Sequence, residues 1–162
     1  MEMTLSIQQR FKEQAIKWVE AKVRYRHRGV NRQGCDCSGL LIGLLKEIGF
    51  LTTYDLGQRT YPFDWNLHTG AGDWIEEGVL KVANEIPNNS IEEGDILAFR
   101  LGRCIAHLGI LIDKKGSIFV HSLSDSKRCV YGVLKNSPWT KRWVKSFRLD
   151  SKKLEKFNRN SK

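Results

Sequence analysis

The sequence predicts an α+β domain, with helices in its first half and an antiparallel sheet in its second. Apolar residues recur at helical spacing near the N-terminus, whereas from Asp95 onward short apolar runs are separated by turn residues. The length of 162 residues, with 41% hydrophobic and 28% charged residues, fits one globular domain. We therefore expect a single domain over residues 1–150, followed by a basic, frayed tail over residues 151–162.

Two helices are predicted before residue 50. Apolar residues from Phe11 onward recur every three or four positions, and Ser6 precedes them as a candidate cap, which predicts a helix from about Ser6 to Lys22. An unbroken apolar run then follows Cys37 and continues to Gly49, a residue type that often ends helices. Because this second helix is apolar on nearly every side, we expect it to be buried.

The middle of the chain, from Leu51 to Pro87, lacks a clear periodicity until a short amphipathic pattern over Asp73 to Ala83. We expect it to be an insertion that shapes a cleft and carries one short helix. Aromatic residues in such a stretch more often pack locally than bind a ligand, although an exposed tryptophan beside a cleft suits stacking on a peptide or glycan. His68 receives no assigned role.

The second half of the chain predicts strands. They cover Asp95 to Arg100, His107 to Ile112, Ser117 to Ser122, Arg128 to Leu134 and Val144 to Leu149. A lysine- and glycine-containing turn at residues 113–116 joins the second and third. We expect an antiparallel sheet of about five to six strands, with the Cys37 helix packed on it.

Cys37, at the start of the second predicted helix, is the candidate nucleophile. The unpaired N–H groups and the positive end of the helix dipole favour a thiolate there, and the thiolate is the nucleophilic form of cysteine. Two histidines, His107 and His121, follow in strand-like settings that an antiparallel hairpin can bring side by side. A cysteine among apolar residues is more often inert. The order and context of Cys37 and the two histidines nevertheless favour catalysis by a nucleophile, a base and an orienting group.

Four segments of the chain resemble the NlpC family of papain-like cysteine peptidases, which cleave bacterial cell-wall peptides. They are Tyr25-Arg26-His27-Arg28-Gly29, Asp36-Cys37-Ser38-Gly39-Leu40, Gly94-Asp95-Ile96-Leu97-Ala98-Phe99 leading to Ala106-His107-Leu108-Gly109-Ile110, and Phe119-Val120-His121-Ser122. Their order and spacing, from about Phe11 to Leu149, make the signal specific. Tyr61-Pro62 and the segment from Trp139 to Trp143 are similar to the phage and prophage branch of that family.

The resemblance implies a papain-like NlpC fold and hydrolysis of an amide bond in peptidoglycan stem peptides, without a metal or other cofactor. It implies that the Tyr25 hydroxyl assists the oxyanion and that Asp36 and Ser38 contact the free amine of the substrate. From the residues alone, Asp36 is also a helix N-cap, and both roles can hold. The resemblance favours the γ-D-glutamyl-diamino acid bond, ahead of the N-acetylmuramoyl-L-alanine amide or a cross-bridge. Phage tail or secretion-apparatus proteins are the further partners that it suggests.

The chain is basic, with a formal net charge of +9 and a pI of about 9.5. This charge suits a polyanion such as nucleic acid, an anionic membrane or a teichoic-acid-bearing wall, and it specifies none of them. Residues 1–20 lack the apolar core of a secretory signal, and no apolar run approaches eighteen residues, so we expect no signal peptide and no membrane span. The protein would then be made in the cytoplasm and reach the wall through a phage particle, lysis or non-classical export.

Two other interpretations stay open. A zinc-stabilised module that binds nucleic acid would use Cys35, Cys37, Cys104 or Cys129 with His107, but Cys35 and Cys37 form the only close pair and lack the usual knuckle spacing. The same fold could instead act as an amidase or acyltransferase on another amide or ester. We expect no disulfides, and we expect Cys35 to be a bystander because cysteines two residues apart pair with strain.

Overall fold

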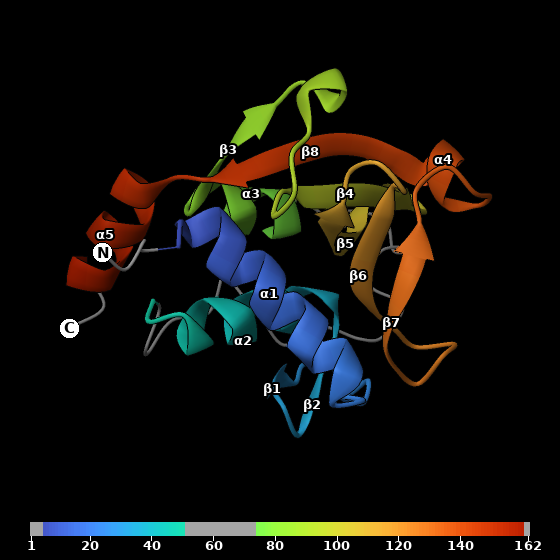
Figure 1. The fold of residues 1–162 in the computed structure, drawn as a ribbon, viewed down its shortest axis with the longest axis horizontal. Helices are drawn as coiled ribbons and strands as arrows, with labels where there is room; N and C mark the ends of the chain where they lie inside the picture. The colour runs from blue at the N-terminus through green and yellow to red at the C-terminus, as the bar shows by residue number, and fades with distance from the viewer. Residues whose placement is uncertain (1–4, 51–73, 161–162) are drawn as a thin grey trace.

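The computed structural model of the chain describes residues 5–50 and 74–160. Its centre is a six-stranded antiparallel sheet with the order β3-β8-β4-β5-β6-β7, and two N-terminal helices pack against one side of it (Figure 1). This confirms the predicted fold class. The predicted insertion lies outside the described residues from Leu51 to Asp73, together with His68 and Tyr61-Pro62.

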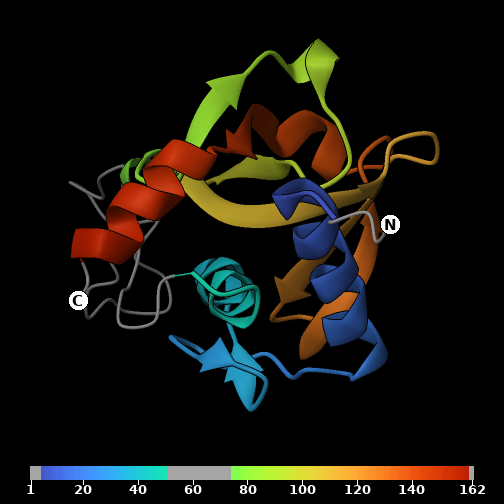
Figure 2. The same cartoon turned by 60° about the vertical axis from the view of Figure 1, so that its left-hand side comes forward.

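The two predicted N-terminal helices are present. Helix α1 spans Ile7–Glu20 and begins at a capping box in which the Ser6 hydroxyl accepts the backbone N–H of Gln9. Helix α2 spans Cys37–Glu47, and Gly49 follows it with a φ of +99°, in the left-handed region that glycine adopts most easily. Figure 2 shows α2 below the sheet with α1 beside it.

All five predicted strands are present, with ends shifted by a few residues. They are β4 (Ile96–Leu101), β5 (Cys104–Asp113), β6 (Ile118–Leu123), β7 (Arg128–Val133) and β8 (Trp143–Leu149). A sixth strand, β3 (Ala83–Ile86), pairs with β8. The remaining elements are the hairpin strands β1 (Val30–Asn31) and β2 (Gly34–Cys35), helix α3 (Trp74–Leu80), the 3₁₀ turn Asn88–Ser90, and the short helix α4 (Trp139–Arg142).

Buried side chains form clusters on both faces of the sheet. The larger cluster joins one face to α1 and α2 and includes Phe11, Trp18 and Leu44. The smaller cluster lies on the other face and includes Phe99 and Phe119. Strand alternation places His107 and His121 on the face of the smaller cluster, so the candidate base and its neighbour stand among aromatic rings.

The C-terminal segment differs from the expectation of a frayed tail, because Ser151–Asn160 forms helix α5. Leu154 is fully buried in the larger cluster, and Phe157 packs against that cluster one turn later. The Lys153 ammonium also donates to the backbone carbonyls of Leu80 and Ala83, each at 2.8 Å. The described part of this segment therefore belongs to the folded domain. Over the described ranges, no helix is both long and apolar enough to cross a membrane.

Candidate active site

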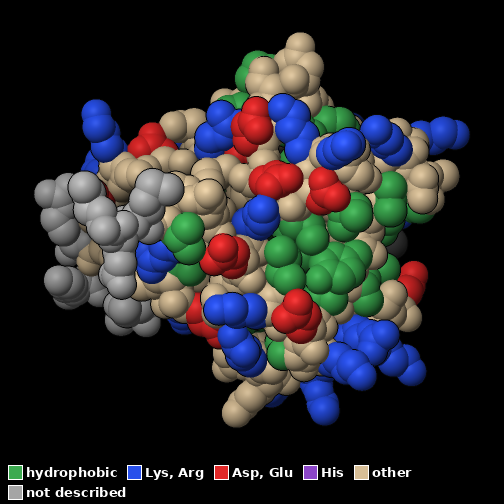
Figure 3. Space-filling view, in the orientation of Figure 1, with side chains coloured by type: hydrophobic (Ala, Val, Ile, Leu, Met, Phe, Trp, Pro, Cys, Tyr) green, Lys and Arg blue, Asp and Glu red, His purple; other side chains and the backbone are tan. Residues whose placement is uncertain are grey.

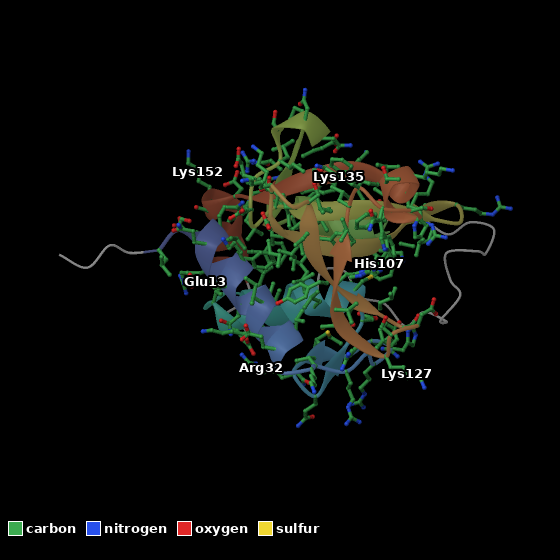
Figure 4. The ribbon with its side chains drawn as sticks, turned by 45° about the vertical axis from the view of Figure 1, so that its right-hand side comes forward. Glu13, Arg32, His107, Lys127, Lys135 and Lys152 are labelled. Atoms are coloured by element: carbon green, nitrogen blue, oxygen red, sulfur yellow. The ribbon has the colours of Figure 1, made fainter. Side chains whose placement is uncertain are left out.

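A pocket of about 190 Å³ lies where the start of α2 meets β5 and the end of β6. Its walls include five of the six predicted site residues: Tyr25, Asp36, Cys37, Ser38 and His107. These residues come from three separate parts of the chain, so the fold brings together what the motifs predict as one site. Figure 4 labels His107.

Asp36 fixes the start of α2. One carboxylate oxygen accepts the backbone N–H of Gly39 at 2.8 Å and the Ser38 hydroxyl at 3.2 Å, and the other accepts the backbone N–H of Arg28 at 2.8 Å. This geometry confirms the N-cap interpretation of Asp36. The same carboxylate ties the loop before the helix to its first turn, so it fixes where Cys37 stands.

The Cys37 thiol lies against the backbone of β5. Its S–H donates to the carbonyl of Ala106, with 3.5 Å between sulfur and oxygen. Ala106 is an extra residue in the ladder between β4 and β5, because Phe99 pairs with His107 whereas Arg100 pairs with Ile105. A bulge of this kind redirects the neighbouring side chains, and here it lies directly before His107.

The Cys37 thiol is protonated at neutral pH. Burial, together with the negative charge of Asp36, raises the pKa of Cys37 to about 12. A helix start favours a thiolate, as predicted from the sequence, but here the effect of the dipole is outweighed by the loss of hydration and by the adjacent carboxylate. Deprotonation of this thiol therefore requires a base within the pocket.

His107 and His121 form a hydrogen-bonded pair, as the predicted hairpin requires. His107 Nε2 and His121 Nδ1 are 2.8 Å apart, and one of the two nitrogens donates to the other. The Ile110–Val120 pairing of β5 and β6 sets the two imidazoles diagonally across the strands. When His107 donates from Nε2, its Nδ1 is unprotonated and free to accept a proton.

Three aromatic side chains enclose the two imidazoles. The Trp139 ring stacks on His107 with centroids 5.3 Å apart and meets His121 edge-on at 4.9 Å. Phe99 and Phe119 contact His107 and His121, respectively, at 5.8 and 4.7 Å. We call Phe99, Phe119 and Trp139 the aromatic cage.

Both imidazoles are neutral at pH 7 because they are buried. Burial lowers the pKa of His107 well below its usual value, with smaller contributions from His121 and the Arg142 cation, and burial lowers the pKa of His121 to about 4. Trp139 is not among the site residues predicted from the sequence. Its contact with the histidines depends on how the chain returns after β7, and no local pattern around Trp139 signals that.

Tyr25 also lines the pocket. Its backbone forms an isolated parallel bridge with Cys35, and its N–H donates to the carbonyl of Lys127 at 2.8 Å. Burial, and then the charge of Asp36, raises the pKa of the Tyr25 phenol, so the hydroxyl keeps its proton and is able to donate.

Cys35 is not among the residues that line the pocket. Its side chain is fully buried, with its sulfur 3.7 Å from that of Cys129, and its carbonyl accepts the Ser122 hydroxyl at 2.6 Å. All four cysteines are free thiols. In the part of the chain that the structure describes, no three His, Cys, Asp or Glu side chains gather in a way that could hold a metal ion.

Comparison with known proteins identifies the family. The family model described as NlpC/P60 matches residues 22–148, which include all six predicted site residues. The chain belongs to the NlpC/P60 family.

Its fold is also similar to two solved NlpC/P60 structures. One is a Staphylococcus aureus protein described as similar to lipoprotein, with a TM-score of 0.62, 18% identity, and coverage of 92% of this chain and 43% of that one. The other is the NlpC/p60 domain of the peptidoglycan hydrolase SagA, with a TM-score of 0.60, 17% identity, and coverage of 89% of this chain and 100% of that one.

Among curated proteins, the chain is similar to one from Escherichia coli K12, named murein DD-endopeptidase MepS/murein LD-carboxypeptidase. The two are 24% identical over 148 residues, which cover 91% of this NlpC/P60 chain and 66% of the E. coli protein. The chain thus spans just under two thirds of the length of that relative.

Proposed function

We propose that this NlpC/P60 protein is a cysteine peptidase that hydrolyses an amide bond in the stem peptides of peptidoglycan. The observation that carries the proposal is the pocket that Cys37, at the capped start of α2, lines together with His107, which is hydrogen-bonded to His121. Membership of the family and the names of its relatives, a peptidoglycan hydrolase and a murein endopeptidase, support the substrate class.

In the proposed mechanism, Cys37 Sγ attacks the carbonyl carbon of the scissile amide while His107 Nδ1 takes the thiol proton. His107 then returns this proton to the leaving amine, and water hydrolyses the resulting thioester. His121 Nδ1 accepts the N–H of His107 Nε2, which orients the base and stabilises its cation. The proton moves during the attack, because the thiol and the imidazole are both neutral beforehand.

The negative charge that develops on the carbonyl oxygen requires hydrogen-bond donors. The Tyr25 hydroxyl is one candidate because it lines the pocket and stays protonated, and the backbone N–H of Cys37 at the start of α2 is another. Asp36 and Ser38 line the same pocket, and we propose that they also contact the free amine of the stem peptide.

The bond that we propose is the γ-D-glutamyl-diamino acid amide. The name of the E. coli relative favours a second candidate, a DD cross-link or LD bond. Digestion of purified peptidoglycan, followed by mass spectrometry of the soluble products, tests the proposal and separates these bonds. We expect new fragments from the wild-type protein and none from Cys37→Ala. Release of the same fragments by both proteins, or of none by either, would contradict the proposed function.

A further inference from the structure

A second concave surface adjoins the active-site pocket. We call it the basic groove, and it is lined by Lys22, Arg24, Tyr25, Ser126, Lys127, Arg128 and Val130. Tyr25 also lines the active-site pocket, so the two are neighbours. Figure 3 shows Lys and Arg side chains gathered at the lower right, near the end of α1 and the loop between β6 and β7, and Figure 4 labels Lys127 in that loop.

The backbone brings these like charges together. Arg24 and Arg128 are direct partners in an antiparallel bridge, which is held by the N–H of Tyr25 on the Lys127 carbonyl and the N–H of Cys129 on the Val23 carbonyl, both at 2.8 Å. Like charges directly opposite one another on paired strands destabilise the folded state. Among the residues that the structure describes, no acidic side chain lines the groove.

Within residues 5–50 and 74–160, none of the four cations of the groove forms a salt bridge. Across the described residues, the acidic groups that form salt bridges are paired with other cations, namely Lys12, Arg32, Lys114, Lys145 and Arg148. The fold therefore tolerates a repulsive pair at Arg24 and Arg128 beside its reactive pocket. An anion bound between the two guanidinium groups would relieve that repulsion, and guanidinium groups bind carboxylates through paired hydrogen bonds.

We propose that the basic groove binds a free carboxylate of the same stem peptide whose scissile amide lies over Cys37. The proposal rests on the proposed function for the substrate class, and its geometry rests on Tyr25, which borders both the groove and the pocket. A stem peptide carries free carboxylates a few bonds from each of its amides, so one peptide can reach from Cys37 to the arginines. Arg24 and Arg128 thereby select the substrate and set its register in the pocket.

The test uses a stem tetrapeptide, L-alanyl-γ-D-glutamyl-diaminopimelyl-D-alanine, and three analogues in which one carboxylate at a time is replaced by a carboxamide. We expect one analogue to have a kcat/KM about tenfold lower than the parent, the loss associated with a charge-assisted hydrogen bond. In the double variant Arg24→Gln/Arg128→Gln, the ratio of the kcat/KM of the parent peptide to that of this analogue should fall from about ten to about one. We vary the arginines because Lys22 and Lys127 have positive φ angles, where a substitution also acts on the backbone.

The matched control is Lys115→Gln/Lys135→Gln, which removes the same charge from exposed positions that line neither surface. This control should keep the tenfold ratio, which separates local recognition from the net charge of the protein. Equal cleavage of all four peptides by the wild type would overturn the proposal. A ratio that survives in the arginine variant would overturn it as well.

Binding measurements distinguish a failure of the carboxylate proposal from a failure of the proposed function. Calorimetric titration of the Cys37→Ala protein with the four peptides measures affinity without turnover. Suppose that the wild type cleaves no stem peptide, but that Cys37→Ala binds the parent about tenfold better than one analogue and this preference depends on Arg24 and Arg128. The carboxylate site in the groove is then supported, and the proposed function is wrong. If glycerol phosphate binds through the arginines while all four peptides bind equally, the site serves a phosphate polymer and the carboxylate proposal is wrong.

Discussion

The two walls of the active-site pocket hold their reactive groups by opposite means. On the cysteine wall, directed hydrogen bonds fix the backbone: Asp36 accepts three, and the Ser122 hydroxyl holds the Cys35 carbonyl. On the histidine wall, one hydrogen bond joins the two imidazoles, and the aromatic cage surrounds them. The difference teaches that polar contacts fix the position of Cys37, the candidate nucleophile, whereas burial sets the proton affinity of His107, the candidate base. Substitutions can therefore perturb the position of Cys37 and the proton affinity of His107 separately.

The largest expected effect distinguishes Cys37, which lines the pocket, from Cys35, which does not. Cys37→Ala should lower the rate of peptide hydrolysis by at least about 10³-fold, because it removes the nucleophile. Cys35→Ala should keep the activity and cost roughly 1 kcal/mol of unfolding free energy, because its buried thiol packs against Cys129. The rate of hydrolysis of a stem peptide measures the activity of each variant, and urea unfolding measures its stability. Loss of activity in Cys35→Ala alone would mean that the motif is wrongly aligned.

The next effect tests the division of roles on the histidine wall. His107→Ala should lower kcat by about 10²- to 10⁴-fold, the range associated with a general base. His121→Gln should lower it only about tenfold, because the amide oxygen of Gln can still accept the N–H of His107 Nε2. Single-turnover kinetics at pH 7.5 measure both. Equal and complete loss in the two variants would refute the assignment of His107 as base and His121 as its orienting group.

A third prediction concerns the aromatic cage. In the wild type, the acid limb of the kcat/KM profile should lie well below pH 6.5, because burial lowers the pKa of His107. Trp139→Leu admits water to the imidazoles, so the limb should move upward, toward the pKa of a free histidine. Profiles measured between pH 4 and pH 8 show the shift.

Trp143→Leu is the control for this prediction. Trp143 packs against the smaller cluster, and its indole N–H donates to Ser146. This substitution should change stability without moving the acid limb. An acid limb that is the same in Trp139→Leu and in the wild type would show that the aromatic cage does not set the proton affinity of the base.

The smallest effect is on stability at low pH. Burial lowers the pKa of His121 to about 4 in the folded protein, whereas an unfolded histidine titrates near 6.5. Between these values the unfolded chain binds more protons, so this residue destabilises the fold as the pH drops from 6.5 toward 4. Urea unfolding at pH 7 and pH 4.5 should show a decrease about 2 kcal/mol smaller in His121→Gln than in the wild type. An identical decrease in both proteins would contradict a neutral, buried His121.

The fold could be predicted where a repeating apolar pattern accompanies each element. Helices α1 and α2 and strands β4 to β8 all have such a pattern, and all were predicted. Strand β3 was missed because Asn84 and Glu85 interrupt its apolar residues, and it exists through pairing with β8. Helix α5 was mistaken for a tail because its composition is that of a solvated segment, and the two residues that anchor it, Leu154 and Phe157, act only through tertiary packing.

The candidate site could be predicted as far as its motifs extend. The proximity of His107 and His121 follows from a hairpin, and the Asp36 cap follows from the helix start. The protonation of Cys37 could not be predicted, because the helix-dipole rule takes no account of burial or of a neighbouring carboxylate. The role of Trp139 could not be predicted either, because it depends on a return of the chain that no local pattern encodes.

The position of β8 in the sheet has a consequence for how the protein is made. A chain that has emerged from the ribosome as far as residue 135 already contains Cys37 and both histidines, but it lacks Trp139 and β8. Because β8 lies between β3 and β4, the sheet closes only after residues 143–149 have been synthesised. Until then the sheet lacks β8, and Trp139 is missing from the contacts that surround His107 and His121 in the folded protein. The surroundings of the two histidines are therefore completed only after residues 139–149 have been synthesised, late in translation of the domain.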